Sequence, residues 1–475
     1  MPEPFVVIGG DAAGLSAASK CKRESPDRDV IVFEKGQWVS YAHCGEPYFV
    51  KGEVDKLENL LSLTPADIEE RDIDLRRGHE VVAVDPDAGT VTVEGPNGKF
   101  EQPYGDLLVA TGARAVTGPI EGHELDGAFP LHGLDDAAAI RAFLLDPSED
   151  ALADVGGEDF VDRERVERFG AMTAPETAAI VGGGYVGVEM AEALSAHSLD
   201  VHVFQRSGHL LSPFGEAVGE AVAEELREQG VTLHLGEEVE RLAGDGRVER
   251  LECEGGTALD IDLAVVGVGV VPNTDLLDGT EVELGADGAV AVDEYGETSV
   301  DGIYAAGDCA KDDHTVTGES AWVPLGLTAN RAGRAVGTTV ASDPTPVGSV
   351  AGTAVVKAFE QECGRVGLLE DGAREAGFDP VSETITTRSR SGYYPGAAET
   401  TVTLVADRAS ERLLGGTIVG TDRAAVRIDT VATALEADMT VDELERADLA
   451  YAPPFSPVWD PILVAAKVLN GKLKD

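Results

Sequence analysis

The sequence predicts an α/β protein with two Rossmann-like dinucleotide-binding domains and a C-terminal α/β domain. A buried strand, a glycine-rich turn and a helix follow one another at residues 5–24, and the same order returns at residues 177–196. At 475 residues the chain is long enough for about three domains of roughly 100–200 residues each. Because 43% of the residues are apolar, each domain has material for its own core.

The charge balance limits where this protein works and what it binds. Asp and Glu number 87 against 37 Lys and Arg, and the net charge of −50 is spread along the chain. Such a surface repels nucleic acid and anionic membranes and needs screening cations, so we expect neither partner and a halophilic setting. The opening residues lack the basic region of a signal peptide, and no apolar run reaches the ~18 residues that span a bilayer. We therefore expect a cytoplasmic protein.

The first glycine turn predicts a dinucleotide site. In "FVVIGGDAAGLSAASK" an apolar strand leads into glycines and an alanine-rich helix, so a pyrophosphate can approach the helix N-terminus. Asp11 occupies the middle position of the G-x-G-x-x-G pattern, so the motif alone is degenerate. The next strand, "DVIVFEK", ends in an acid that can hold a ribose 2′-hydroxyl. The residues expected at this site are Gly9, Gly10, Ala12, Ala13, Gly14, Glu34 and Lys35.

The second glycine turn has the full G-x-G-x-x-G spacing at Gly182, Gly184 and Gly187. Its following strand, "DVHVFQR", ends in Gln205 and Arg206 where the first unit has an acid. An acid would repel a ribose 2′-phosphate, whereas glutamine and arginine would accept it, so we expect NADPH to be favoured over NADH. A solvated loop charge is the alternative interpretation of Arg206.

Further motifs in the expected order make the family resemblance plain. "DLLVATGARA" is a strand leading to a Thr-Gly turn, "DLAVVGVGVVPNTDLL" echoes it, and "TSVDGIYAAGDCA" ends in a Gly-Asp pair. Over about 300 residues the chain resembles the pyridine nucleotide–disulfide oxidoreductases. The resemblance implies FAD at the first site and NADPH or NADH at the second, with Asp308 bound to the flavin ribityl chain. It adds Thr111, Gly112 and Gly307 to the FAD site, and Tyr185 and Gly269 to the nicotinamide site.

The resemblance also implies the domain organisation. We expect a discontinuous FAD domain at 1–120 and 254–345 and a NAD(P) domain at 121–253. The acidic segment 146–172 is not required by the family pattern, and we interpret it as a solvated excursion. Residues 346–475 are expected to form the dimerisation domain of a homodimer.

Cys44 in "SYAHCGEPYF" is the candidate redox centre. The five cysteines form no C-x-x-C or C-x-x-x-x-C pair, and the fifth residue after Cys44 is Phe49. A single thiol cannot close an internal disulfide, so it would cycle through a mixed disulfide, a persulfide or a sulfenic acid. The cysteines at other positions are expected to be small buried residues.

The Cys44 stretch most resembles the single-cysteine branch of the family, particularly coenzyme A-disulfide reductases. Their pattern Ser-x-x-x-Cys-Gly-x-Pro-Tyr is matched from Ser40 to Tyr48. NADH peroxidases and water-forming NADH oxidases carry a histidine at the first glycine turn, where this chain has Ala12. His43 would either lower the thiol pKa or contact substrate, or it would point away from the sulfur.

Other site residues follow from the same resemblance. A tyrosine of the partner subunit is expected to reach the sulfur, and the candidates are Tyr451, Tyr393 and Tyr394. Lys20, Arg23 and Arg331 are expected to bind coenzyme A phosphates, with surface ion pairs as the alternative. No His or Cys cluster has metal-ligand spacing.

These observations predict an FAD-dependent NAD(P)H oxidoreductase that reduces coenzyme A disulfide, or a similar small disulfide, through Cys44. A water-forming NAD(P)H oxidase is one alternative, which Ala12 and Gln205 disfavour. A coenzyme A persulfide or polysulfide reductase is another and would use nearly the same site. A flavin-binding protein without turnover is the remaining class.

Overall fold

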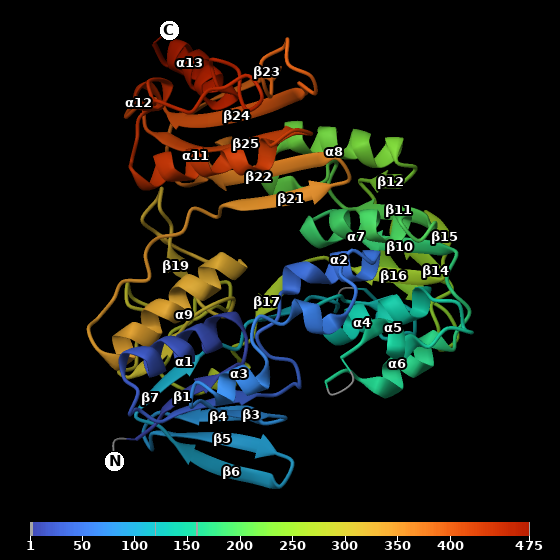
Figure 1. Cartoon of the computed structure of the whole chain (residues 1–475), viewed down its shortest axis with the longest axis vertical. Helices are drawn as coiled ribbons and strands as arrows, with labels where there is room; N and C mark the ends of the chain where they lie inside the picture. Colours follow the sequence, from blue (N-terminus) through green and yellow to red (C-terminus); the bar gives the residue numbers. More distant parts are fainter. Residues whose placement is uncertain (1–2, 119, 158–159, 475) are drawn as a thin grey trace.

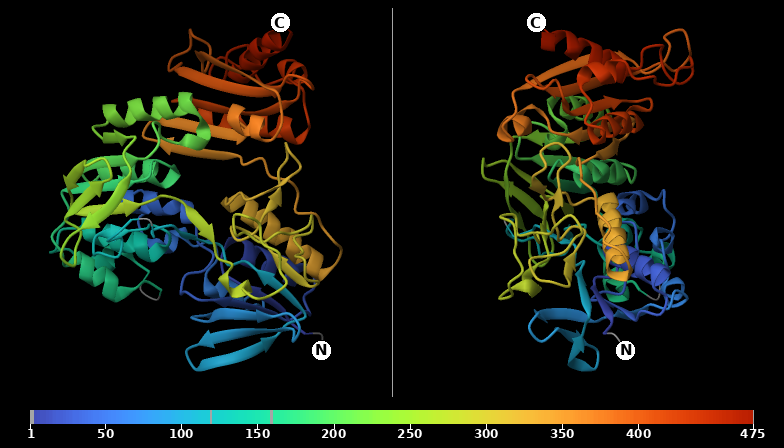
Figure 2. Two further views of the ribbon diagram at one scale, coloured as in Figure 1. Left: turned by 180° about the vertical axis from the view of Figure 1, so that it is seen from behind. Right: turned by 90° about the vertical axis from the view of Figure 1, so that its left-hand side faces the viewer.

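Three α/β bodies make up the protein in this computed structural model, which describes residues 3–118, 120–157 and 160–474. The C-terminal body lies at one end of the long axis, and the N-terminal body lies at the other (Figure 1). The second dinucleotide unit lies to one side between them, in both the front and the back view (Figures 1 and 2). The predicted α/β class is confirmed. None of the described helices combines the length and the apolar character needed to cross a membrane.

The N-terminal body is built on a parallel sheet in the order β18-β7-β1-β2-β3. Its strands are β1 (Phe5–Ile8), β2 (Val30–Glu34), β3 (Asp74–Arg77), β7 (Asp106–Val109) and β18 (Ile303–Ala305). The apolar runs of β1 and β2 are buried, as expected for a sheet covered on both faces. Because β18 pairs with β7, two distant stretches of the chain form one body.

Two helices pack closely against each other on this sheet. α1 (Ala12–Glu24) and α9 (Gly326–Ala341) lie side by side (Figure 1). A Cβ added at Gly333 would lie 2.1 Å from the Ala13 carbonyl oxygen, so only glycine allows this approach. On the other side lies an antiparallel sheet of β4 (Glu80–Asp85), β5 (Thr90–Gly95) and β6 (Gly98–Pro103). The short helix α3 (Pro65–Glu69) belongs to this body, whereas α2 (Glu46–Lys51) packs on helices of the second body (Figure 1).

The second body has the sheet order β12-β11-β10-β16-β9. Its strands are β9 (Ala128–Phe129), β10 (Thr177–Val181), β11 (Asp200–Gln205), β12 (Thr232–Leu235) and β16 (Leu263–Val266), with helices α4 (Leu134–Leu144), α7 (Tyr185–Ser195) and α8 (Glu216–Glu228). A small antiparallel sheet contains β13 (Val239–Ala243), β14 (Arg250–Cys253) and β15 (Ala258–Asp260). The expected boundary at 253 is wrong, because β16 follows it and pairs with β10.

The expectation that 146–172 is a solvated excursion is also wrong for its described residues. α5 (Ala151–Val155) and α6 (Arg163–Gly170) pack on α4, and Val155 and Phe169 are buried. The Phe169 ring lies 4.9 Å from that of Phe129. Although the segment is acidic in composition, it contains apolar residues at helical spacing, and these residues determine how its helices pack.

Two short strands connect the first two bodies. β8 (Ala113–Ala115) and β17 (Val270–Pro272) pair antiparallel, so the two echoing motifs of the sequence meet. The Thr111 hydroxyl donates to the Asn273 carbonyl at 2.5 Å, and the Asn273 side chain donates to the Thr111 carbonyl at 3.0 Å. The two chain segments that cross between the bodies are therefore hydrogen-bonded to each other.

The C-terminal body is an antiparallel sheet with helices packed on it. Its order is β21-β22-β25-β24-β23. The strands are β21 (Ala354–Ala358), β22 (Gln361–Gly367), β23 (Pro380–Arg388), β24 (Glu399–Asp407) and β25 (Leu413–Gly420), and the helices are α10 (Glu370–Glu375), α11 (Ala424–Glu436), α12 (Val441–Glu445) and α13 (Pro461–Lys474). The chain enters this body after β19 (Asp312–Asp313), β20 (Ser320–Ala321) and α9.

Glu192 joins α2, α7 and the C-terminal body at one point. This residue of α7 is 6% exposed and accepts hydrogen bonds from Lys51 Nζ at 2.7 Å and Lys357 Nζ at 2.8 Å. Its second oxygen accepts the Phe359 N–H at 2.7 Å. Lys51 lies in α2, which packs on α7, and Lys357 lies in β21, so one buried carboxylate bonds α2 and the C-terminal body to the second body.

Candidate active site

The first glycine turn fits the pyrophosphate of a dinucleotide. A Cβ at Gly9 would lie 2.1 Å from the Ala110 carbonyl, and one at Gly14 would lie 2.0 Å from the Gly9 carbonyl. The turn therefore packs tightly against the sheet and opens toward the N-terminus of α1. At the end of β2, Glu34 accepts the Gly10 N–H at 2.9 Å, which places its carboxylate beside the turn.

The second turn repeats this geometry. A Cβ at Gly182 would lie 2.2 Å from the Gly267 carbonyl and one at Gly187 would lie 1.9 Å from the Gly182 carbonyl, whereas one at Gly184 would meet nothing within 4 Å. The open space at Gly184 suits a pyrophosphate. Gln205 accepts the Gly183 N–H at 2.8 Å, in the position that Glu34 has in the first turn. Beside it, the exposed Arg206 lies 3.6 Å from a Glu238 oxygen.

The remaining cofactor residues lie around these two turns. Ala13 packs beneath Gly307, where an added Cβ would lie 3.0 Å from the Ala13 Cβ, and Asp308 follows directly. Burial raises the pKa of Asp308, the His43 charge lowers it and Asp11 raises it, so the three groups face one another. Gly269 has φ +128 and open space around its Cα. Ala12, Lys35, Thr111, Gly112 and Tyr185 lie on the same turns or at their strand ends.

Cys44 lies in a 3-10 turn, His43–Gly45, that leads directly into α2. Its thiol is exposed, whereas the other cysteines are buried. Surrounding protein raises the pKa of Cys44 by desolvation, and the charges of Glu189 and Glu46 raise it further. Where they are ionised, these two carboxyls therefore oppose the thiolate.

The side chain of His43 is hydrogen-bonded to Asp11. Its Nε2 lies 2.6 Å from Asp11 Oδ2, and the other Asp11 oxygen accepts the Tyr41 N–H at 3.0 Å. Burial lowers the pKa of His43, but the hydrogen bond and charge of Asp11 outweigh burial and raise it. The Tyr41 ring lies on the imidazole with centroids 4.2 Å apart. This geometry favours a protonated imidazole in a fixed orientation.

Two carboxyls, one buried and one half-buried, lie near the thiol. Glu46 is 3% exposed, and burial raises its pKa to about 8. Glu189 on α7 accepts the Tyr48 hydroxyl at 2.9 Å, and burial raises its pKa to about 7. Cys44 is thus surrounded by groups that hold protons near neutral pH. An exposed thiol, a protonated imidazole and two glycine turns on one chain suit electron transfer from a nicotinamide, through a flavin, to sulfur.

Comparison with known proteins agrees with this arrangement. Residues 3–332 match the family described as pyridine nucleotide-disulphide oxidoreductase, and residues 353–461 match its dimerisation domain. The chain belongs to this family. It is an FAD-dependent NAD(P)H oxidoreductase, which confirms the expected enzyme class and cofactors.

Relatives of this oxidoreductase are named for sulfur chemistry. It is 38% identical over 98% of both chains to the NAD(P)H sulfur oxidoreductase (CoA-dependent) of Pyrococcus abyssi. It is 37% identical over 99% of both chains to the NAD(P)H coenzyme A polysulfide/persulfide reductase of Pyrococcus horikoshii. A coenzyme A disulfide reductase of Staphylococcus haemolyticus is 28% identical over 95% of this chain and 96% of that protein. The structure of an NAD-dependent persulfide reductase from A. fulgidus superposes with TM-score 0.90 at 32% identity, over 99% of this chain and 83% of that chain.

Three residues of this oxidoreductase's site were missed by sequence reasoning. Asp11 was noted only as a departure from the glycine pattern, and Glu46 occupies the variable position of Cys-Gly-x-Pro-Tyr. Glu189 lies on a helix of the other dinucleotide domain. A signal for Asp11 and Glu46 existed, since an acid within a cofactor turn and one next to a reactive cysteine are both costly to bury.

The expected substrate-binding residues are split between two helices. Lys20 pairs with Glu24, and Arg23 is exposed on the same helix. On α9, which packs against α1, Arg331 donates to the Ser349 carbonyl at 3.3 Å. Ser40 has φ 49, and its N–H donates to the Gly10 carbonyl at 3.0 Å, which fixes the segment leading to Cys44.

The three candidate tyrosines lie in the C-terminal body. Tyr393 and Tyr394 are in the loop between β23 and β24, and both are exposed, as is Tyr451. A hydrogen bond with Tyr451 raises the pKa of Tyr393. The β23–β24 loop lies at the outer end of this body, well away from α2 (Figures 1 and 2). Within one chain these tyrosines therefore do not meet Cys44.

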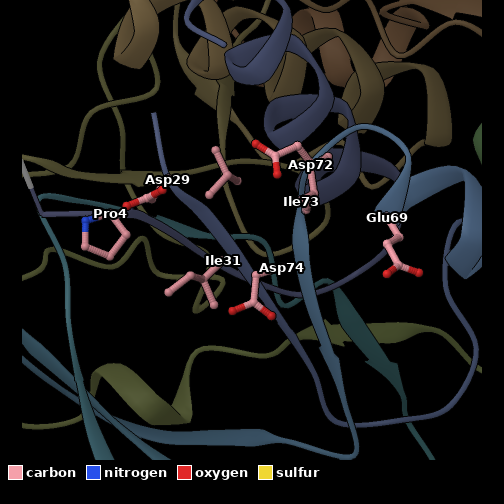
Figure 3. A pocket seen from close by; sticks show the side chains of 8 residues that line it. Pro4, Asp29, Ile31, Glu69, Asp72, Ile73 and Asp74 are labelled. Atoms are coloured by element: carbon pink, nitrogen blue, oxygen red, sulfur yellow. The ribbon is translucent and has the colours of Figure 1, made fainter. Parts of the chain in front are cut away.

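A cavity of about 400 Å³ elsewhere on the FAD domain does not belong to this site (Figure 3). Pro4 and Asp29 precede β1 and β2, so the cavity lies at the opposite ends of these strands from the glycine turn. Ligands of such sheets bind at the carboxyl ends of the strands. Its acidic lining, which includes Asp72 and Asp74, also does not suit the phosphates of FAD.

Proposed function

We propose that this oxidoreductase reduces a sulfur–sulfur bond carried by coenzyme A, a persulfide or polysulfide first and the disulfide second. The single observation that carries the proposal is Cys44, an exposed thiol next to a histidine that is bonded to Asp11. The sequence alone favoured the disulfide. Relatives named for sulfur or persulfide reduction, at 37–38% identity, support the opposite order, since those named for disulfide reduction are 28–29% identical.

Different residues of the chain are proposed to carry out different steps of the reaction. FAD held at the first turn would supply the transfer of electrons from NAD(P)H to sulfur. The Cys44 thiolate attacks coenzyme A's own sulfur atom and breaks its bond to the second sulfur, which forms a Cys44–coenzyme A mixed disulfide and releases hydrosulfide, or coenzyme A when the substrate is the disulfide. His43 donates a proton to the sulfur that leaves. Two electrons then cleave the mixed disulfide, release coenzyme A and restore the Cys44 thiolate.

The charges around the site support this substrate and coenzyme. Lys20, Arg23 and Arg331 are the cations proposed to bind coenzyme A phosphates, on the two helices that pack beside the first turn. At the second turn, Gln205 and Arg206 lack the acid that would repel a 2′-phosphate, so NADPH is the proposed coenzyme.

A homodimer is proposed to complete the site. The C-terminal body exposes aromatic side chains, among them Tyr451, Phe455 and Trp459. Exposed aromatic clusters of this kind are typical of interfaces. In the proposed dimer, Tyr451 of the partner subunit donates a hydrogen bond to the departing sulfur.

Anaerobic oxidation of NADPH in molar KCl tests the proposal. Wild type, Cys44→Ser and the buried-thiol control Cys253→Ala are each supplied with coenzyme A persulfide, coenzyme A disulfide or neither. Turnover with a sulfur acceptor in wild type and Cys253→Ala, lost in Cys44→Ser, is the expected result. Oxidation that begins only when oxygen is admitted would replace the proposal with a water-forming oxidase.

A further inference from the structure

Cys44 lies next to a row of three ionisable side chains, of which the proposed sulfur chemistry uses one. Asp11 precedes α1, His43 lies in the 3-10 turn and Glu46 begins α2. The imidazole stands between the two carboxyls, with Nε2 2.6 Å from Asp11 Oδ2 and Nδ1 3.7 Å from Glu46 Oε1. Each ring nitrogen therefore faces one carboxyl.

Asp11 fixes one end of this row. Its two oxygens are bonded to the Tyr41 N–H and to His43, so the carboxylate cannot rotate without losing a bond. A carboxylate at Nε2 favours the doubly protonated ring, in which Nδ1 also carries a proton. The 3.7 Å from Nδ1 to Glu46 is too long for a direct hydrogen bond, so Nδ1–H is free to face a substrate atom.

Glu46 is buried and bonded differently from Asp11. Its Oε1 has no hydrogen-bond partner in the described part of the protein. Burial raises its pKa to about 8, the charge of His43 lowers it, and Asp136 of α4 and Asp11 raise it. At neutral pH it is therefore mostly an uncharged acid. The ionisable groups that face Glu46 or its partner His43 include Asp11, Tyr41, Cys44, His132, Asp136 and Asp308.

The reaction needs two protons at this place. Reducing R–S–S–R′ to RSH and R′SH takes two electrons and two protons. One sulfur anion leaves when Cys44 attacks, and the other leaves when the mixed disulfide on Cys44 is reduced. Each leaves more readily if a neighbouring acid protonates it. His43 can donate one proton, the proton on Nδ1. Glu46 holds a second proton, and its Oε1 lies 3.7 Å from His43 Nδ1.

We propose that His43 and Glu46 form a two-proton store for Cys44 chemistry, and that Asp11 is the positioning residue which holds His43 in the store. His43 Nδ1–H protonates the first sulfur anion as its S–S bond breaks. Once Nδ1 has lost its proton, the ring and the Glu46 carboxyl close their 3.7 Å gap, the carboxyl proton passes to Nδ1, and the reloaded imidazole protonates the second anion. Protons from solvent refill both groups. This inference rests on the proposed reduction of a sulfur–sulfur bond at Cys44.

The pH dependence of turnover tests the store. Wild type, Glu46→Gln, Glu46→Asp and Asp11→Asn are compared under anaerobic steady-state conditions, with the exposed Glu375→Gln as control. We expect wild-type kcat to fall above about pH 8 as Glu46 loses its proton. Glu46→Gln should lower kcat by ~10-fold or more and remove this alkaline limb, since it keeps the side-chain shape but holds no exchangeable acid proton.

The other variants separate a proton role from a structural one. Glu46→Asp should keep the alkaline limb and part of the rate, and Asp11→Asn should move the His43 titration to lower pH. The rate of flavin reduction by NADPH without acceptor, and KM for NADPH, should not change in Glu46→Gln. A Glu46→Gln enzyme with wild-type kcat and a wild-type alkaline limb would overturn the store.

An infrared measurement tests the store without turnover. Wild type at pH 7 should show the carbonyl band of a protonated, buried carboxyl that is missing from Glu46→Gln. Absence of such a band in wild type would overturn the inference even if sulfur reduction is observed. Conversely, a wild-type protein that shows the band but reduces no sulfur acceptor would refute the proposed function. The protonated Glu46 would then have no role in sulfur reduction.

Discussion

Asp11 and His43, 32 positions apart, are joined by a 2.6 Å contact between a carboxylate oxygen and Nε2. One side chain comes from the turn proposed to hold the FAD pyrophosphate, and the other is the neighbour of Cys44. This turn therefore also supplies the carboxylate that raises the pKa of His43.

The first prediction concerns this pair. In Asp11→Asn the pKa of His43 should fall, because burial already lowers it and the charge that outweighed burial is gone. Titration of ¹⁵N-histidine-labelled protein by NMR, with His43 assigned from a His43→Asn sample, measures the shift. Asp245→Asn, an exposed change on another domain, is the control and should leave the curve in place. An unaltered His43 titration in Asp11→Asn would contradict the prediction.

Glu46 predicts how stability depends on pH. Its pKa is about 8 in the folded chain, and an unfolded glutamate has a pKa of ~4.3. Between these values the folded state holds a proton that the unfolded state has lost, so the Glu46 contribution to the free energy of unfolding falls as pH rises from about 4 to about 8. Glu46→Gln should therefore gain melting temperature relative to wild type across this range. Melting curves at fixed KCl test it, and Glu375→Gln should follow wild type.

Local patterns were enough to predict much of this molecule. The two strand–turn–helix units, and the acid or glutamine that ends the next strand, are each encoded within about 30 residues, and the α/β class they predict is confirmed. Contacts between distant segments were beyond such patterns. Asp11 meets His43, Glu192 meets Lys357, and the acidic 146–172 segment buries Phe169, only because the whole fold brings them together.

Arg206 predicts coenzyme preference. Its side chain is 79% exposed, next to Gln205 at the second turn, where a 2′-phosphate is expected. Arg206→Ala should raise KM for NADPH by ~10-fold, the loss of about one charge-assisted hydrogen bond, and leave KM for NADH unchanged. Steady-state kinetics with both coenzymes at one salt concentration measures this, and Arg227→Ala on α8 is the matched control. Equal effects on NADPH and NADH would show that Arg206 does not read the 2′-phosphate.

The net charge of −50 predicts a dependence on salt. Like charges repel over a distance that shortens as ionic strength rises, so the compact state should lose stability in dilute buffer. We expect the melting temperature to fall, and flavin to be released, when KCl is dialysed away. Flavin fluorescence during stepwise dialysis measures the release. Retention of flavin and of the melting temperature after prolonged dialysis without salt would contradict this expectation.

Glu192 predicts a large stability change from one substitution. Its carboxylate is buried and accepts hydrogen bonds from Lys51, Lys357 and the Phe359 N–H. Glu192→Ala leaves these donors without their partner, and breaking a buried ion pair in this way costs about 3–5 kcal/mol. Because Lys51 and Lys357 are partly exposed to water, the lower end of this range is expected.

Denaturant unfolding in molar KCl measures the effect of Glu192→Ala, and Glu224→Ala on the exposed face of α8 is its control. Since Glu192 joins the C-terminal body to α7, the variant should also unfold in separate steps, with the C-terminal body losing its contact to α7 first. A single transition at the wild-type midpoint would mean that apolar packing, and not this carboxylate, holds the C-terminal body to α7.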